Sequence, residues 1–234
     1  MNREFTNFLR FILDSFLPPI LRDNKFMMYP LFYIWFKGKN VVKLMEFKSR
    51  VADLLDDEYV EFYKIYDSLP KRATDLNKNS IHFILEQLGG NKNLKIIDIG
   101  CGNGFLLSKL KNLGYRQLYG CDIINDLTDK SIPFIMANIE HLPFKDDEYD
   151  IVLCNHTIEH IINKYKAAIE LKRIAKYKVI VTTPKQRYYR YTFDLHVNFF
   201  PQKIDLISLM NMESFTCTEF NGDWSFAGNK NSEA

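Results

Sequence analysis

A glycine-rich loop that directly follows a short apolar run is the feature that most constrains this chain. The run covers residues 94–99 and contains Asp98, and the loop from 100 to 104 reads Gly-Cys-Gly-Asn-Gly. Glycine allows a tight turn and lets a ligand approach the backbone closely. Residues 105–113 then show apolar side chains at helical spacing. A strand, a glycine loop and a helix in this order are typical of a doubly wound sheet, in which adenosine cofactors bind at the first such loop.

The rest of the second half alternates apolar runs with helical patterns. The runs predict further strands at 117–123, 132–137, 149–154, 177–182, 215–220 and 224–227, and the patterns predict helices at 80–88, 164–176 and 201–210. Continuous apolar strands separated by helices indicate a parallel sheet covered on both faces. We therefore expect an α/β fold with a doubly wound, mostly parallel, seven-stranded sheet over residues 80–234.

Residues 1–79 differ, because they are rich in aromatic residues and show only helical patterns. One apolar face runs from Phe5 to Phe16, an apolar patch covers 27–36, and helices are expected at 41–55 and 59–69. This extension is expected to be a helical cap that packs on the catalytic domain. A second reading is a peripheral membrane contact through residues 1–36 or a lid over an apolar substrate. No apolar run there approaches the roughly 20 residues that a bilayer requires.

The net charge and the cysteines indicate which partners and which cellular compartment to expect. The net charge of +2 is small for a dedicated nucleic-acid-binding protein, so no nucleic-acid partner is expected. The four cysteines are widely spaced and form no CxxC pair. Such cysteines are usually buried small hydrophobes, which fits a reducing cytoplasm. We expect a cytoplasmic protein, with peripheral attachment to the inner face of the membrane as the alternative.

Asp122 lies about twenty residues beyond the loop, at the end of the next predicted strand. A carboxylate there can accept hydrogen bonds from both hydroxyls of a ribose. The loop spacing is G-x-G-x-G rather than the G-x-G-x-x-G of dinucleotide-binding folds, since Phe105 occupies the last position. The pattern therefore does not match the dinucleotide-binding fingerprint.

The segment D-I-G-C-G-N-G, residues 98–104, resembles the first motif of class I S-adenosylmethionine-dependent methyltransferases. In that family this loop holds the methionine part of the cofactor. The resemblance implies S-adenosylmethionine as the cofactor of this chain. The residues that it implies for this part of the site are Asp98, Gly100, Cys101, Gly102, Gly104, Asp122 and Ile123.

Residues 137–161 are similar to the type 11 methyltransferase family, a branch that includes quinone-biosynthesis enzymes. An acidic residue of that family contacts the adenine amino group from a position that is Asn138 here, and an amide oxygen can accept the same hydrogen bond. The resemblance further implies that the backbone N–H of Ile139 meets adenine and that Asn155 lies beside the sulfonium.

The sequence His-Thr-Ile-Glu-His at 156–160 also fits H-x-x-E-H, a zinc-peptidase signature in which two histidines one helical turn apart share a metal. The strand that runs directly into it and the coherent use of the preceding residues favour the methyltransferase. We predict no metal and keep a zinc hydrolase as a minor alternative. Glu159 and His160 are then expected either to orient the loop after the fourth strand or to take part in catalysis.

Residues 182–201 interleave aromatic side chains with two arginines, and His196 lies among them. A loop at the carboxyl end of a strand would face the acceptor. The alternative, held equally, is that these aromatic side chains pack on the N-terminal helices. Similar enzymes carry a histidine in this loop, so His196 is the first candidate for a catalytic base and His160 the second.

The function that we predict is methylation of a small-molecule acceptor, on oxygen. A saccharide or a lipid-linked sugar is preferred as acceptor, because the helical N-terminus resembles bacterial methyltransferases of polysaccharide pathways. The alternative acceptor is a quinone or isoprenoid precursor. A protein that binds the cofactor without catalysis is the remaining alternative from another class.

Overall fold

The computed structural model describes residues 18–54, 58–62 and 73–230, and the chain forms two compact units. The first contains residues 1–72 and 187–199, and the second contains residues 73–186 and 200–234. This division differs from the expected one at 79/80. The boundary lies earlier, and residues 187–199 leave the sheet-bearing unit because their aromatic side chains belong to the core of the first unit.

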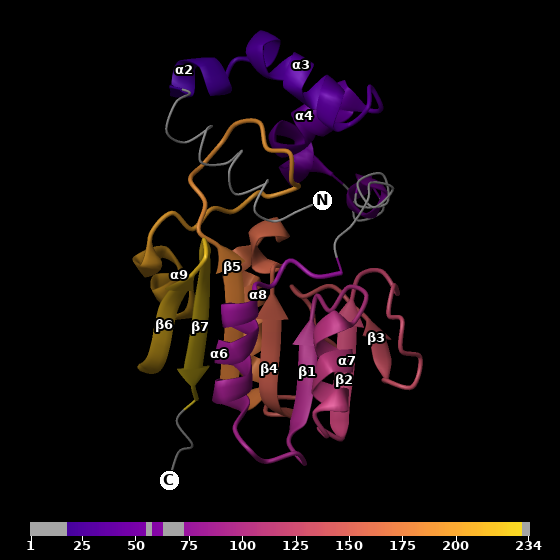
Figure 1. Cartoon of the computed structure of the whole chain (residues 1–234), viewed down its shortest axis with the longest axis vertical. Coiled ribbons are helices and arrows are strands. Elements are labelled where there is room, and N and C mark those ends of the chain that lie inside the picture. The colour runs from indigo at the N-terminus through magenta and orange to yellow at the C-terminus, as the bar shows by residue number, and fades with distance from the viewer. Residues whose placement is uncertain (1–17, 55–57, 63–72, 231–234) are drawn as a thin grey trace. The chain divides into compact units, whose positions relative to one another are not determined.

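The second unit is built on a seven-stranded sheet with strand order β3-β2-β1-β4-β5-β7-β6 (Figure 1). The strands are β1 (Lys95–Ile99), β2 (Gln117–Asp122), β3 (Phe134–Met136), β4 (Tyr149–Asn155), β5 (Ala175–Pro184), β6 (Ser214–Phe220) and β7 (Asp223–Asn229). The first five strands run parallel, and β7 is antiparallel to both β5 and β6. The predicted doubly wound, mostly parallel sheet is therefore confirmed.

Helices cover both faces of this sheet. Successive strand side chains point to opposite faces, so Ile96 and Ile97 of β1 belong to different core clusters. Helices α6 (Lys78–Leu88) and α7 (Phe105–Asn112) pack on the face of Ile96, and Figure 1 shows both in front of the sheet. Helices α8 (Lys164–Ile174) and α9 (Lys203–Met210) cover the face of Ile97.

Several element boundaries differ from those predicted. The third strand is only Phe134–Met136, and the fifth begins at Ala175, so α8 ends earlier than expected. Helix α6 begins at Lys78, two residues before the predicted start at 80, because the side chain of Asn77 accepts the N–H of Ser80 and caps the helix. All four cysteines are free and buried, as expected for small hydrophobic side chains.

The first unit is helical over its described part. It contains α2 (Pro19–Arg22), α3 (Lys25–Trp35), α4 (Val41–Arg50) and a 3-10 turn, η1 (Val51–Asp53), and residues 58–62 are also helical. The predicted helix at 41–55 thus ends in 3-10 geometry. The predicted apolar helical face from Phe5 to Phe16 lies outside the described residues, as does most of the predicted helix at 59–69.

The segment 187–199 completes the core of the first unit. The Phe193 ring stacks on Phe32 with centroids 4.7 Å apart and also meets Trp35 at 4.9 Å. Tyr191 and Leu195 are buried in the same cluster. Of the two readings of the aromatic loop, packing on the N-terminal helices therefore accounts for these residues. Among the helices that the structure describes, none combines the length and apolar content needed to cross a bilayer.

Candidate active site

The glycine loop joins the end of β1 to α7 through a tight backbone turn. Gly100 and Cys101 both donate their N–H groups to the carbonyl oxygen of Cys121 in β2, at 2.7 and 3.2 Å. Gly104 donates to the Cys101 carbonyl at 2.9 Å. Gly100, Gly102 and Gly104 have φ values of 75°, 51° and 77°, in the region that glycine adopts without strain. The sequence spacing of the glycines follows from these conformations.

The three loop glycines have different surroundings. A Cβ atom on Gly100 would lie 2.1 Å from the hydroxyl of Thr157, and one on Gly104 would lie 2.2 Å from Leu127. These two glycines are required because the backbone approaches a neighbouring side chain. A Cβ atom on Gly102 would meet nothing within 4 Å. Gly102 is therefore the loop position whose side-chain direction is open to a ligand.

Asp122, the last residue of β2, organises the same loop. One carboxylate oxygen accepts the N–H of Gly102 at 2.8 Å, and the other accepts the N–H of Ile123 at 2.7 Å. Burial raises the pKa of this carboxyl, while the bonds from these backbone N–H groups act in the opposite direction. Two carboxylate oxygens offer about four acceptor positions. Asp122 thus retains capacity for the ribose hydroxyls that the sequence predicts.

Asp98 and Asn155 bring buried polar atoms to the ends of adjacent strands β1 and β4. One carboxylate oxygen of Asp98 and both polar atoms of the Asn155 amide are buried in this structure without a hydrogen-bond partner. Burial raises the pKa of Asp98 to about 7, an effect that the nearby Asn155 amide reduces and the charge of Asp122 increases. Unsatisfied buried polar groups are costly, so their presence together indicates a polar ligand.

The turn after β3 carries Asn138 and Ile139. Asn138 is exposed, and its side-chain oxygen accepts the N–H of Glu140 at 2.9 Å, so this oxygen also stabilises the local turn. Ile139 is buried in the core on the α8 side of the sheet. The backbone of this turn is therefore held in place on both sides of the position that the resemblance assigns to adenine.

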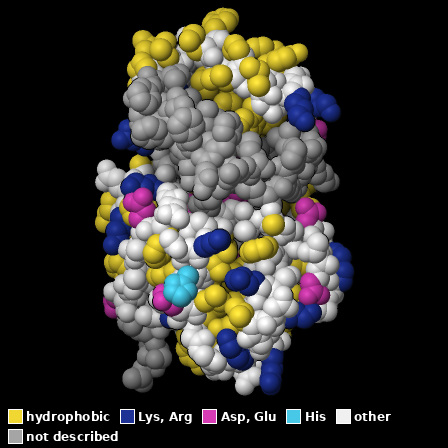
Figure 2. All heavy atoms as spheres, in the orientation of Figure 1, with side chains coloured by type: hydrophobic (Ala, Val, Ile, Leu, Met, Phe, Trp, Pro, Cys, Tyr) yellow, Lys and Arg dark blue, Asp and Glu magenta, His cyan; other side chains and the backbone are white. Residues whose placement is uncertain are grey.

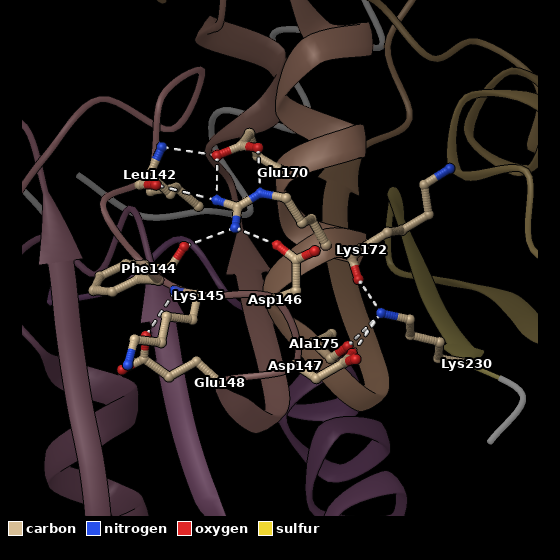
Figure 3. Close-up of polar contacts among 11 residues, drawn as sticks. Leu142, Phe144, Lys145, Asp146, Asp147, Glu148, Glu170, Lys172, Ala175 and Lys230 are labelled. Atoms are coloured by element: carbon tan, nitrogen blue, oxygen red, sulfur yellow. Dashed lines mark hydrogen bonds and ion pairs between the residues drawn. The ribbon is translucent and has the colours of Figure 1, made fainter. Parts of the chain in front are cut away.

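An arginine on α8 clamps the stretch that follows, and sequence reasoning did not identify it. Arg173 donates to the carbonyl oxygens of Leu142 and Phe144 at 3.1 and 2.7 Å and to both oxygens of Glu170 at 2.7 Å. Glu170 in turn accepts the N–H of Leu142 at 2.9 Å, and Asp146 pairs with Arg173 at 2.9 Å (Figure 3). The sequence signal that could have identified this ion pair is a glutamate and an arginine three residues apart on a predicted helix. The planar guanidinium satisfies several acceptors at once, which a lysine would not do.

The segment 156–160 does not form the helix that a zinc-peptidase motif requires. His156 has a φ of 49° and lies outside the 3-10 turn η2 (Ile158–His160). Its two ring nitrogens lie 3.3 Å from carboxylate oxygens of Glu159 and Asp223. The minor alternative of an H-x-x-E-H zinc site therefore loses one of its two histidines, because both ring nitrogens of His156 face carboxylates.

His156 is the centre of a buried charged cluster that also includes Asn77 and Thr183. Asn77 donates to Asp223 at 3.0 Å, and the Thr183 hydroxyl donates to Glu159 at 3.3 Å. Burial alone would lower the pKa of His156, but the carboxylates of Asp223 and Glu159 outweigh it and raise the pKa to about 10. The side chain is thus an imidazolium at neutral pH. The cluster links β4, η2, β5, β7 and the start of α6.

The two candidate bases lie in different units. His160 ends η2 in the second unit and is half-buried. His196 is buried in the segment 187–199, which belongs to the first unit. Their catalytic roles stay predictions, and so do the cofactor contacts assigned to individual residues.

The comparisons with known proteins agree with this geometry. A family model described as a methyltransferase domain, of the type 11 family, matches residues 97–181. That segment includes the glycine loop, Asp122, Asn138, Ile139 and Asn155. Residues 97–181 therefore match the type 11 family of methyltransferases. The chain carries a methyltransferase domain whose cofactor is S-adenosylmethionine.

The relatives extend this likeness over part of the chain. An uncharacterized protein of Methanocaldococcus jannaschii is 35% identical over 133 residues, which are 56% of this chain and 58% of that protein. A ubiquinone/menaquinone biosynthesis C-methyltransferase of Shewanella frigidimarina is 27% identical over 172 residues, 63% of this chain and 67% of that enzyme. The chain thus spans little more than half the length of the Methanocaldococcus protein.

A solved structure shares the fold. An S-adenosylmethionine-dependent methyltransferase from Aquifex aeolicus superposes with a TM-score of 0.51 at 15% sequence identity, over 64% of this chain and 88% of that one. This likeness supports the Rossmann-like methyltransferase arrangement of the sheet. The donor set also fits the cofactor: Asp122 has acceptor capacity for ribose, Gly102 is open to a ligand, and Asp98 and Asn155 have polar atoms for an amino-acid group.

We expect Gly102→Ala to weaken S-adenosylmethionine binding by about tenfold or more, because the methyl group enters the space that a ligand would use. Gly114→Ala is the matched control, since Gly114 also has a positive φ and open space around its Cβ direction. Both variants should lose similar folding stability, about 1–2 kcal/mol from left-handed strain. Calorimetric titration measures the affinities. Equal affinities in the two variants would contradict the placement of the ligand at Gly102.

We expect His156→Gln to lower the free energy of unfolding by about 3–5 kcal/mol, because it leaves two buried carboxylates without their cation. The raised pKa implies that the stabilisation is complete below the ordinary histidine value of 6.5 and is lost as pH rises through about 10. Urea unfolding at several pH values checks both points. His82→Gln, at an exposed pair with Glu86, is the control and should change little. A similar loss and a similar pH dependence in the two variants would be evidence against the buried cation.

Proposed function

We propose that this chain transfers the methyl group of S-adenosylmethionine to an oxygen atom of a small-molecule acceptor, with a saccharide or lipid-linked sugar as the preferred class. The observation that carries the proposal is the set of groups at the carboxyl ends of β1, β2 and β4. Gly102 is open to a ligand, Asp122 holds the loop through backbone N–H groups, and Asp98 and Asn155 have unsatisfied buried atoms. Ligands of doubly wound sheets bind at this edge, where the strand order reverses between β1 and β4.

When bound, S-adenosylmethionine supplies an electrophilic methyl group on its sulfonium. The residues that we propose to hold it are those of the glycine loop, Asp98, Asp122, Ile123, Asn138, Ile139 and Asn155. A hydroxyl acceptor must lose its proton as it is methylated, and a histidine suits this role near neutral pH. We propose His196 as the first candidate base and His160 as the second. Alignment of the acceptor is the other contribution of the protein, worth about 7–11 kcal/mol at best.

Two acceptor classes are distinguished by different observations. The sugar rests on the resemblance of the helical N-terminus to methyltransferases of polysaccharide pathways. The quinone or isoprenoid precursor rests on the Shewanella relative, whose name places it in ubiquinone and menaquinone biosynthesis. Tyr188 and Arg187 of the aromatic segment are exposed, which leaves them available to an acceptor with a ring and a charge. A protein that binds the cofactor without turnover is the alternative from another class.

We also propose where the reaction takes place and which acceptors it does not use. A lipid-linked acceptor suits a cytoplasmic protein that contacts the inner face of the membrane peripherally through residues 1–36, of which 18–36 are described. A nucleic-acid acceptor is not expected for a chain of net charge +2. Both statements remain predictions.

We expect the purified chain to bind S-adenosylmethionine with micromolar affinity and NAD not at all. Asp122→Asn should weaken binding by about tenfold or more, because the amide offers fewer acceptors to ribose and to the N–H of Gly102. Isothermal calorimetry measures both affinities, and circular dichroism checks the fold. Asp126→Asn, a nearby carboxylate outside the proposed donor set, is the control. Absence of binding by the folded wild type would overturn the proposal.

We expect radiolabel from the methyl group of S-adenosylmethionine to enter the organic phase of a bacterial lipid extract. Mild acid, which cleaves sugar from a lipid carrier, should then move the label into the aqueous phase. Label that stays with the lipid after acid would indicate the quinone class instead. Label in RNA, or no transfer to any fraction by a chain that binds the cofactor, would contradict a small-molecule acceptor. His196→Asn and His160→Asn in the same assay test the two candidate bases.

A further inference from the structure

Helix α3 is apolar around its whole circumference, although only one stripe of it is buried. Met28, Phe32 and Phe36 lie one turn apart and face the core of the first unit. The remaining positions of the helix are also mostly large and apolar. A helix that is hydrophobic on every side normally has partners on every side. The outward faces of α3 therefore indicate a further apolar environment.

The exposed large apolar side chains of α2 and α3 lie between Ile20 and Ile34. Phe26 is 87% exposed, Ile20 80% and Ile34 75%. With them we define an outer apolar surface that also contains Leu21, Met27, Tyr29, Leu31 and Tyr33. Figure 2 shows hydrophobic side chains gathered over this part of the chain. Contiguous exposed apolar surface of this kind marks an interaction site, whereas single exposed side chains do not.

Most of the charges beside the outer apolar surface are positive, and the acidic residue between α2 and α3 is Asp23, which is half-buried and accepts the backbone N–H of Arg190 at 3.0 Å. Residues 24–45 contain four lysines and no aspartate or glutamate. Lys37 and Lys39 are exposed in the turn directly after α3. Lys25, at the start of the helix, pairs with Glu46 at 2.8 Å. Exposed lysines next to exposed aromatic and aliphatic side chains match a surface that is apolar inside and anionic at its boundary.

We propose that the outer apolar surface of α2 and α3 binds peripherally to an anionic lipid bilayer, with Phe26 and Ile34 entering the acyl boundary and Lys37 and Lys39 at the phosphate level. Helix α3 has 11 residues, about half of the roughly 20 needed to span a bilayer, so it lies in the interface. Binding of such helices combines apolar burial with attraction to anionic lipids. The proposal holds whichever acceptor the enzyme uses.

The charge distribution favours a bilayer over a second copy of this chain. In a dimer of two outer apolar surfaces, residues 24–45 of the second copy would offer Lys37 and Lys39 no carboxylate. A self-complementary interface repeats the same patch on both sides, so the second copy adds the same excess of lysines. Anionic headgroups offer the opposite charge to the same lysines.

The test is flotation of the full chain with vesicles of phosphatidylcholine alone or mixed with phosphatidylglycerol. We expect binding to the mixed vesicles that exceeds binding to neutral vesicles about tenfold and weakens with added salt. Phe26→Glu with Ile34→Glu should lower binding about tenfold or more. Lys37→Gln with Lys39→Gln should reduce the preference for anionic vesicles and retain part of the apolar binding.

The matched control is Ile169→Glu with Ile204→Glu, two isoleucines on α8 and α9 that are 60% and 55% exposed. This variant should bind vesicles as the wild type does, and S-adenosylmethionine titration shows that each variant remains folded. No vesicle binding by a folded wild type, or equal loss in both double variants, would overturn the proposal. A wild-type dimer that Phe26→Glu with Ile34→Glu converts to a monomer, without vesicle binding, would assign the surface to self-association.

Discussion

The buried ion cluster around His156 fixes the edge of the sheet on which the site is built. The imidazolium of His156 lies 3.3 Å from a carboxylate oxygen on each side, and removal of one member of a buried ion pair is strongly destabilising. Asp223 reaches the cluster because β7 runs antiparallel to β5 and so begins at the edge where the parallel strands end. The cluster thereby joins the end of β4 to strands that follow much later in the chain.

Thr157 connects this cluster to the glycine loop, residues 100–104. His156 holds a left-handed backbone conformation, which directs Asn155 and Thr157 on either side of it. Thr157 lies so close to Gly100 that no side chain fits there, and the glycine loop takes its path from that contact. Asp122 then fixes Gly102 from the opposite strand. The loop is therefore held from the β4 side and the β2 side together, and buried polar atoms of Asp98 and Asn155 have no hydrogen-bond partner in this structure.

Local patterns in the sequence were sufficient for the sheet, the glycine loop and Asp122, because each depends on residues close together in the chain. Apolar runs identify strands, and the required φ values identify glycines. The sequence could not predict that Asp223 pairs with His156 or that Asn77 donates to Asp223, since these two residues look like an ordinary strand start and an ordinary helix cap. Arg173 was missed for the same reason: its carbonyl acceptors have no sequence signature. Long-range polar pairing depends on topology that residue patterns do not encode.

The aromatic segment 187–199 has a structural role that its composition alone does not reveal. Its position after β5 suggested a substrate loop, yet Tyr191, Phe193 and Leu195 complete the core of the first unit. Phe32 and Trp35 on the inner side of α3 take those contacts, whereas Tyr29 and Tyr33 on its outer side lie outside the core cluster that the described residues form. The first unit therefore includes residues 187–199 in the core on the inner face of α3. The bilayer that we propose for the outer apolar surface would give the exposed side chains of the same helix an apolar environment.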